Sequence, residues 1–199
     1  MVGKVSGVVN GQAREGVALL LSKRVLEGVV EYREVSARLM WVKVKFGEEF
    51  WVFVSAYGPG SEEEREAFWS ELAGCVEERK RSGCQVIVLG DLNARVGNEE
   101  VHGVMGKYGV PGRNVSGDRL LEMCAEMELV VGNTFFRKKG INKFTWQRID
   151  NGRLVERAMM DYVLVEKSVL GRLVDVHVAR GAGGGVSDHF LVVAKVKGG

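Results

Sequence analysis

The sequence predicts an α/β sandwich of mixed sheets with the helices on the outside. Three observations predict it: many short apolar strands, few helices, and one strand–helix–strand unit over residues 50–89. The chain has 199 residues, of which 46% are hydrophobic and 27% charged, a composition typical of a globular domain with a full core. We therefore expect one domain over residues 1–199.

The first elements are strands. The apolar run at residues 17–21 (VALLL) predicts a strand, and the partly alternating run at 39–46 (LMWVKVKF) predicts another. A link of hairpin length leads to a third strand at 50–56 (FWVFVSA), which YGPG at 57–60 ends.

Residues 61–81 are the clearest predicted helix. Ser61 and Glu64 fit a capping box, in which each side chain accepts a hydrogen bond from the other residue's backbone N–H. Gly83 is a typical helix stop, and the strand 85–89 (QVIVL) follows it. The apolar stripe that should face the sheet contains Phe68, Leu72, Cys75 and Val76.

The second half alternates short elements with turns. Residues 97–117 hold six glycines and Pro111, which predicts a long surface loop. A second helix is predicted over 118–128. Short strands are then predicted at 129–131, 144–147, 159–165, 173–178 and 190–196.

Composition limits the classes of partner. The formal net charge is only +2, so any basic surface for nucleic acid has to be local. The three cysteines, Cys75, Cys84 and Cys124, fit no zinc-site spacing, and we expect reduced thiols. Residues 1–11 lack the apolar centre of a secretory signal, and no apolar run approaches the ~18 residues that span a bilayer. We expect an intracellular protein with no membrane partner.

Asp91 and Asn93 directly follow the predicted strand 85–89. Side chains two apart on a strand point to the same face, so we expect both to project into one cleft at the strand's carboxyl end. An aspartate supplies a base or metal ligand, and an asparagine can hold a phosphate oxygen or the attacking water. The pair favours hydrolysis of a phosphate ester, although Gly-Asp is also common in ordinary turns.

A second candidate group is Ser187-Asp188-His189, between the glycine-rich segment 181–185 and the last strand. Neighbouring aspartate and histidine side chains can act as a metal ligand and an acid–base group. A simple turn with an incidental histidine explains the same residues, and both interpretations stay open.

Asp161 lies within the apolar run 158–165, in phase with Val163 and Val165. A carboxylate on a core-facing strand is costly unless it is paired. Its partner is either a histidine that it orients, as in a catalytic triad, or an arginine such as Arg157.

Other polar residues carry weaker signals. Tyr57 ends its predicted strand, where its hydroxyl could reach a phosphate or simply lie at the rim. His102 and His177 are expected to be ordinary surface residues.

Five motifs in order, SAYGP, GDLNARVG, FTW, MDYVLV and SDHFLV, resemble the endonuclease/exonuclease/phosphatase superfamily. The likeness is to the apurinic/apyrimidinic-type endonuclease domain of non-LTR retrotransposons. Through GKYG and NTFF it extends to the craniofacial development protein 2-like descendants of that domain. The resemblance implies a four-layer α/β sandwich with two mixed β-sheets and Mg²⁺-dependent phosphodiester hydrolysis, with Mn²⁺ as a second candidate metal.

The resemblance also implies roles for the matching residues. Asp91 would orient or deprotonate the attacking water, and Asn93 would position that water and the phosphate. His189 would contact the scissile phosphate, with Asp161 fixing its ring. These roles agree with the way phosphate transition states are stabilised, by positioning and charge.

Three further roles follow from the same likeness. Asp188 would help to hold the metal, Tyr57 would contact the phosphate from the other side, and Thr145 would touch the substrate backbone. Basic residues beside FTW could follow a DNA backbone or form a solvated hairpin tip: Arg137, Lys138, Lys139, Lys143 and Arg148.

The start of the chain does not match the family. The family places an asparagine and then a metal-binding glutamate on strands that precede GVALLLSK, where this chain has only residues 1–15. Neither Asn10 nor Glu15 matches those positions. We therefore expect a domain that is N-terminally truncated relative to the family, lacks its N-terminal strand or strands, and has weakened Mg²⁺ affinity and unpaired sheet edges.

Three functions stay open. The first is a metal-dependent DNA endonuclease of retrotransposon origin that nicks DNA. The second is a catalytically impaired remnant that acts as a nucleic-acid or protein-binding module. The third is a phosphatase on a small phosphorylated substrate. We expect DNA as the partner, a monomer, and a nuclear rather than cytoplasmic location.

Overall fold

The computed structural model describes residues 8–9, 12–13, 16–181 and 187–198. Asn10 and Glu15 lie outside the described residues, as does most of the glycine-rich segment 181–185. The chain divides into two compact units, which we call unit 1 (residues 1–90 with 198–199) and unit 2 (residues 91–197).

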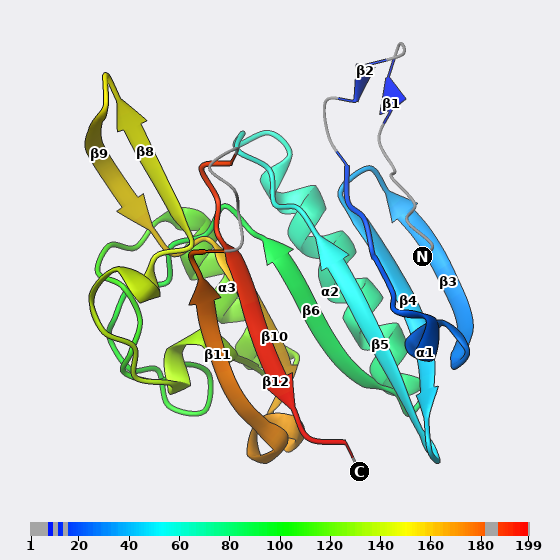
Figure 1. Cartoon of the computed structure of the whole chain (residues 1–199). Coiled ribbons are helices and arrows are strands. Elements are labelled where there is room, and N and C mark those ends of the chain that lie inside the picture. Colours follow the sequence, from blue (N-terminus) through cyan, green and yellow to red (C-terminus); the bar gives the residue numbers. More distant parts are fainter. Residues whose placement is uncertain (1–7, 10–11, 14–15, 182–186, 199) are drawn as a thin grey trace. The chain divides into compact units, whose positions relative to one another are not determined.

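Unit 1 is built around a mixed sheet. The strands β3 (Val29–Ser36), β4 (Leu39–Phe46) and β5 (Glu49–Ala56) pair antiparallel in that order, and β6 (Gln85–Asp91) joins β5 in parallel. The helix α2 (Arg65–Arg81) crosses one face of β4, β5 and β6 (Figure 1). The predicted strand–helix–strand unit is confirmed.

The predicted apolar stripe of α2 is buried, and Gly83 follows the helix with a φ of +73°. The helix begins at Arg65, four residues later than predicted, because Ser61 does not cap it. The Ser61 hydroxyl instead donates to Glu64 Oε2 at 2.9 Å, and the Glu64 side chain caps no backbone group. The predicted capping box is wrong.

The predicted strand at 17–21 is also wrong. These residues have no strand pairing, and the side chain of Leu20 is 70% exposed. They lead into the short helix α1 (Lys23–Leu26). A strand needs a partner for its backbone groups, and the described strands provide none here.

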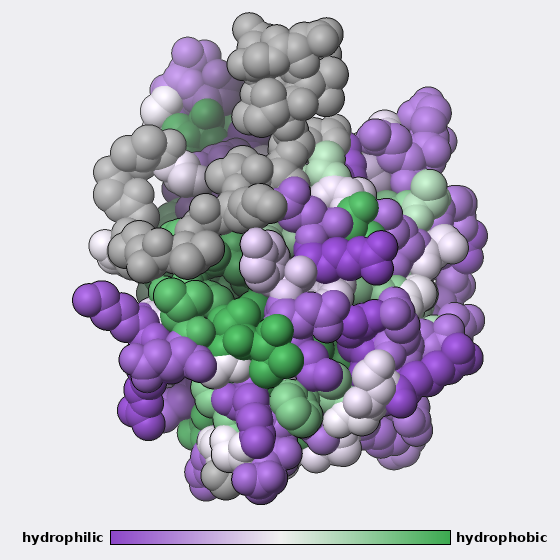
Figure 2. All heavy atoms as spheres, turned by 90° about the vertical axis from the view of Figure 1, so that its right-hand side faces the viewer, coloured by the Kyte–Doolittle hydropathy of each residue, from purple (hydrophilic) through white to green (hydrophobic). Residues whose placement is uncertain are grey.

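The sequence pattern does not predict β3, because its residues do not alternate in polarity and most are exposed. Val30 is 56% exposed at this edge of the unit 1 sheet. Figure 2, which views the molecule from the right-hand side of Figure 1, shows a group of apolar side chains next to hydrophilic ones. The short strands β1 (Val8–Val9) and β2 (Gln12–Ala13) form a separate antiparallel pair.

Unit 2 begins with the predicted glycine-rich loop, which ends where Asn114 caps α3 (Val115–Glu126) through a bond from the Gly117 N–H. The strand β7 (Leu129–Val131) pairs antiparallel with β10 (Asp161–Glu166). Three short 3₁₀ helices occupy Gly132–Phe135, Gly140–Lys143 and Lys167–Arg172.

Two hairpins complete unit 2. One joins β8 (Trp146–Asp150) to β9 (Arg153–Ala158), and Figure 1 shows it extending from the rest of the unit. The other joins β11 (Leu173–Ala179) to β12 (Leu191–Val196). The predicted mixed α/β class is confirmed.

The cores of both units are apolar, and Leu72, Val52, Leu120 and Leu164 are among the side chains with no exposed surface. Cys75, Cys84 and Cys124 are buried and free, as predicted. Among the described residues, no helix combines the length and apolarity that crossing a membrane would require.

Candidate active site

The site begins where β6 ends. Gly90 has a φ of +145°, and a Cβ at this position would lie 1.9 Å from the carbonyl oxygen of Ala56. Only glycine is compatible with that approach. The glycine of the Gly-Asp pair is therefore required by packing, and it places Asp91 at the strand's end.

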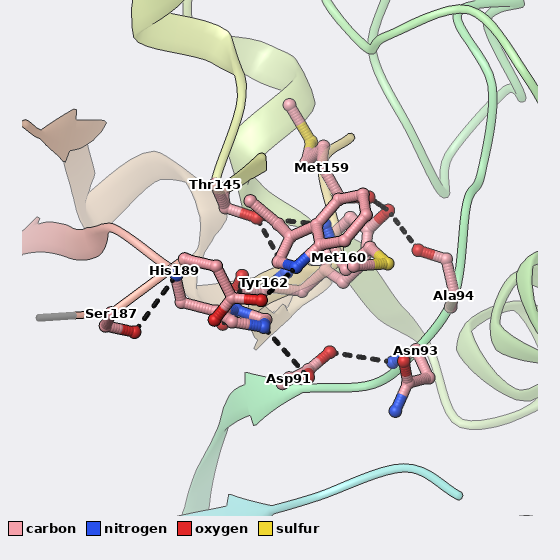
Figure 3. Close-up of polar contacts among 12 residues, drawn as sticks. Asp91, Asn93, Ala94, Thr145, Met159, Met160, Tyr162, Ser187 and His189 are labelled. Atoms are coloured by element: carbon pink, nitrogen blue, oxygen red, sulfur yellow. Dashed lines mark hydrogen bonds and ion pairs between the residues drawn. The ribbon is translucent and has the colours of Figure 1, made fainter. Parts of the chain in front are cut away.

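The alternation of side chains along a strand predicts that Asn93 and Asp91 share a face. In the structure they do not. The strand ends at Asp91, and Asn93 has a φ of +46°, so the chain turns between them. The Asn93 backbone N–H donates to Asp91 Oδ1 at 2.9 Å (Figure 3). The Leu92 N–H donates to the Met160 carbonyl at 2.9 Å, which fixes this turn beside the start of β10. Left-handed non-glycine residues are strained and cluster at functional sites.

A second segment, residues 188–190, lies against the start of β8. The Gln147 N–H donates to the Asp188 carbonyl at 3.0 Å, and the Phe190 N–H donates to the Thr145 carbonyl at 2.7 Å. These backbone bonds give the SDH motif a fixed position instead of a loose turn.

The two segments meet around one imidazole ring. His189 Nδ1 lies 3.0 Å from Asp161 Oδ2, and His189 Nε2 lies 3.7 Å from Asp91 Oδ2 (Figure 3). The side chains of Asp91 and Asp161 are only 17% and 18% exposed. The partner of Asp161 is therefore the histidine and not Arg157.

Charge and burial set the protonation of this group. The hydrogen bond from His189 to Asp161 raises the pKa of the imidazole above its usual value. Burial raises the pKa of Asp91 to about 6, and the negative charges of Asp161 and Asp188 act in the same direction. The shift of His189 favours the protonated ring, and the raised pKa of Asp91 makes that carboxylate a better proton acceptor than an ordinary aspartate.

Buried polar groups hold Asp161 in place. Thr145 Oγ1 accepts hydrogen bonds from the backbone N–H groups of Met160 and Asp161, at 2.9 and 3.1 Å. Asn133 Nδ2 donates to the Asp161 carbonyl at 3.0 Å. Since Thr145 has no exposed surface, its hydroxyl supports the site from within, and its predicted contact with substrate stays a prediction.

Tyr162 ties β10 to the turn after β6. Its hydroxyl lies 2.9 Å from the Ala94 carbonyl oxygen and 2.8 Å from that of Met159. Burial raises the pKa of this hydroxyl, so it stays a neutral donor. Sequence reasoning gave no role to Asn133 or Tyr162, although a polar residue inside an apolar run is the signal that could have found them.

Tyr57 belongs to unit 1. The Arg38 guanidinium lies 5.2 Å from the centroid of its ring, and the Tyr57 N–H donates to the Arg38 carbonyl at 2.9 Å. Its predicted contact with a phosphate stays a prediction.

Among the described residues, no group of three or more His, Cys, Asp or Glu side chains could hold a metal ion. The oxygen donors nevertheless suit Mg²⁺ in kind. Asp188 is exposed and accepts a hydrogen bond from Trp146 Nε1 at 2.8 Å, and its charge contributes to the raised pKa of Asp91. Because Mg²⁺ keeps several waters and uses one or two carboxylates, Asp188 and Asp91 are the residues that would hold it.

The chain was compared with known proteins. No protein-family model matches it. Craniofacial development protein 2 of Bos taurus is 30% identical over 188 residues, which are 92% of this chain and 31% of that protein. The chain spans about a third of the length of the curated relatives it matches. It is a distant homologue of craniofacial development protein 2.

Solved structures share its fold. The endonuclease domain of TRAS1, a telomere-specific non-LTR retrotransposon, has a TM-score of 0.68 and 14% identity, covering 98% of this chain and 80% of that chain. An endonuclease/exonuclease/phosphatase family protein from Leptotrichia buccalis has a TM-score of 0.67 and 16% identity, covering 98% and 70%. The chain has the endonuclease/exonuclease/phosphatase superfamily fold.

A third structure with this superfamily fold is a complex. It contains the 3′ phosphatase NExo from Neisseria bound to product DNA hairpin, with a TM-score of 0.61 and 16% identity, covering 85% of this chain and 71% of that chain. Together with the homology to craniofacial development protein 2, the fold confirms the resemblance drawn from the motifs.

Proposed function

We propose that this chain is a metal-dependent DNA endonuclease that nicks DNA by hydrolysing a phosphodiester. The observation that carries the proposal is the His189 ring held between Asp161 and Asp91. The choice of DNA is supported by two proteins of similar fold, the TRAS1 endonuclease domain and NExo bound to product DNA hairpin. The proposal includes the four-layer sandwich of the superfamily, a single monomeric domain, and a nuclear location.

In this proposal His189, Asp161, Asp91 and Asn93 each act on the phosphate or on the attacking water. The imidazolium of His189 donates from Nε2 to an oxygen of the scissile phosphate, while Asp161 keeps the proton on Nδ1. Asp91 accepts a proton from the attacking water, whose oxygen bonds to phosphorus as the bond to the leaving oxygen breaks. The leaving oxygen departs with the electron pair of that bond and takes a proton from solvent. Asn93 positions that water. Mg²⁺, or Mn²⁺ in its place, when held by Asp188 and Asp91, would neutralise charge on the phosphate.

Nicking of supercoiled plasmid tests the proposal. With Mg²⁺, the wild-type protein is expected to convert supercoiled DNA to open circles, and chelation by EDTA should stop this. Asp91→Ala and His189→Ala should each remove the activity. Equal residual nicking by all three proteins would mean a contaminating nuclease and would remove the support for the assignment.

A second candidate is DNA binding without cleavage. It is favoured by one observation, that the described residues offer two carboxylates for a metal and no group of three acidic or histidine ligands. Salt-dependent DNA binding by a protein that nicks nothing at any Mg²⁺ or Mn²⁺ concentration would support this candidate over the first.

A further inference from the structure

Arg180, at the end of β11, is held rigidly next to the SDH motif. Its guanidinium carbon lies 3.8 Å from the centroid of the Phe190 ring. Nη1 donates to the Ile141 carbonyl at 3.1 Å, and Nη2 donates to Gln147 Oε1 at 2.9 Å. An arginine fixed in this way loses little conformational freedom when it binds a further group.

The charge of Arg180 is not compensated. Among the described residues, no carboxylate pairs with Arg180 or with its neighbour Arg157. By contrast, Arg95 and Arg148 both pair with Glu156, at 2.6 and 3.8 Å. Arg180 and Arg157 are therefore two neighbouring guanidinium groups for which the described residues supply no carboxylate.

The β8–β9 ladder places the two cations on one face. Gln147 lies directly opposite Arg157 in the antiparallel register, so their side chains share a face, and Gln147 also bonds Arg180. The Nε atom of Arg157 is buried and has no hydrogen-bond partner. Desolvation and the charge of Arg157 both lower the pKa of Arg180. Two partly desolvated cations without a counter-ion favour the binding of an anion.

Arg180 and the candidate active site share one pocket, which has a volume of about 350 Å³. Arg180, Gln147 and Phe190 line it together with His189, and among the described residues of its lining only Asp188 carries a carboxylate. The volume lies in the range of sites that take small ligands or parts of larger ones.

We propose that Arg180, assisted by Arg157, binds the backbone phosphate next to the scissile one. This inference rests on the proposed function and names the feature of the substrate that the site selects. A guanidinium group matches the geometry of phosphate oxygens, and Phe190 fixes its plane. The site consequently selects substrates that carry a second phosphate, such as a polynucleotide, over a small molecule with one phosphodiester.

The test compares two substrates of the wild-type protein. One is a duplex oligonucleotide that contains a mapped nicking site, and the other is bis(p-nitrophenyl) phosphate, which has a single phosphate. Arg180→Gln is expected to raise KM for the duplex about 10- to 100-fold, because a charged hydrogen bond contributes about 1.5–3 kcal/mol. It should leave kcat on the duplex, and kcat/KM on the small diester, within about threefold. Arg180→Lys should restore part of the lost affinity.

A neutral methylphosphonate at the adjacent position identifies the contact. It should weaken duplex cleavage by the wild-type protein but have little further effect in Arg180→Gln, since the two changes remove the same interaction. The control is Arg119→Gln, which alters an arginine on α3 that is already paired with Glu122 at 2.9 Å.

Independent, additive losses from the methylphosphonate and Arg180→Gln would overturn the inference, as would an equal loss on both substrates. If the wild-type protein cleaves neither substrate, the proposed function fails, and the inference is then decided by binding. In that case, equal affinity of the wild-type protein for the duplex with and without the methylphosphonate would overturn the inference.

Discussion

Two histidine–aspartate pairs lie in unit 2 at almost the same distance. His189 Nδ1 is 3.0 Å from Asp161 Oδ2, and His177 Nδ1 is 2.9 Å from Asp175 Oδ2. In the second pair Asp175 also binds Lys138 Nζ at 2.5 Å. Burial acts to raise the pKa of Asp175, but hydrogen bonds from Lys138 and His177 lower it below its usual value, so that carboxylate already has two partners.

The first pair is different because a further carboxylate faces the ring. Both carboxylate oxygens of Asp161 contact His189, and the opposite ring nitrogen faces Asp91. Among the described residues, His177 contacts no carboxylate besides Asp175. The histidine–aspartate contact is common to both pairs, so it does not by itself distinguish a catalytic site. In the proposed function the distinguishing group is Asp91, which faces the second ring nitrogen of His189.

The largest expected difference between the pairs is in catalysis. His189→Ala should lower the initial rate of plasmid nicking by about 10²–10⁴-fold, because it removes a donor to the charged transition state. His177→Ala should stay within about threefold of the wild-type rate. Similar losses from both substitutions would break the comparison.

Of the two aspartates, Asp161 should matter more for catalysis than Asp175. The difference should be smaller than that between the two histidines. Asp161→Asn preserves the shape of the side chain but no longer fixes the protonated Nδ1 of His189, and we expect roughly a 10²-fold loss of kcat. Asp175→Asn should leave kcat unchanged, which a parallel nicking assay checks. A fully active Asp161→Asn protein would show that the orientation of His189 does not matter.

Replacing Asp91 and replacing Asp175 should change the stability of the folded protein at pH 8 in opposite directions. The pKa of Asp91 in the folded protein, about 6, lies above its ordinary value of 3.8, so stability is lost as pH rises toward 6 and the penalty is complete above it. This difference in pKa corresponds to a loss of at most about 3 kcal/mol in the free energy of unfolding. Asp91→Asn should therefore raise Tm at pH 8 in metal-free buffer, with little effect near pH 4.

Asp175 gives the matched control for that measurement. Because its pKa is lowered in the folded protein, its contribution is present at neutral pH and is lost as pH falls. Asp175→Asn should lower Tm at pH 8 by a small amount, as expected for a partly exposed ion pair. An Asp91→Asn protein that loses stability at pH 8 would contradict the pKa assigned to Asp91.

Comparing two buried threonines distinguishes the positioning of the candidate active site from the stabilisation of the fold. Thr145 Oγ1 accepts from two backbone N–H groups at the start of β10, whereas Thr134 Oγ1 accepts from the Gly106 N–H and donates to the Val131 carbonyl. A valine at either position should cost about 1–3 kcal/mol of stability, measured by urea unfolding. Only Thr145→Val should also lower kcat, by about tenfold, because it shifts Asp161. An equal effect of both on kcat would show that Thr145 has no special role.

The sequence predicted elements well where apolar side chains are buried. The bounds of β4, residues 39–46, agree because its apolar side chains face a core. β3 has no such signal, since it pairs along an edge and exposes most of its side chains. The apolar run at 17–21 resembled a strand, but pairing depends on a partner that local sequence does not reveal.

The same distinction applies to the site. The resemblance carried by the motifs implies that Asp161 lies beside His189, and the structure has this contact as well as the approach of His189 to Asp91. The burial of Asp161 required a partner but left histidine and arginine open. The position of Asn93 could not be predicted from strand periodicity, since it depends on a left-handed backbone. Arg180 was missed because an unpaired arginine is recognisable only when its surroundings are known.

The central claim is that the scissile phosphate binds at the Nε2 side of His189. Imidazole ¹⁵N NMR tests it directly, because the chain has only three histidines, which His→Ala variants can assign. In EDTA, addition of duplex DNA should shift the Nε2 resonance of His189 and leave the resonances of His177 in place. Saturating DNA that leaves the His189 ring unchanged, or shifts both rings equally, would contradict the account.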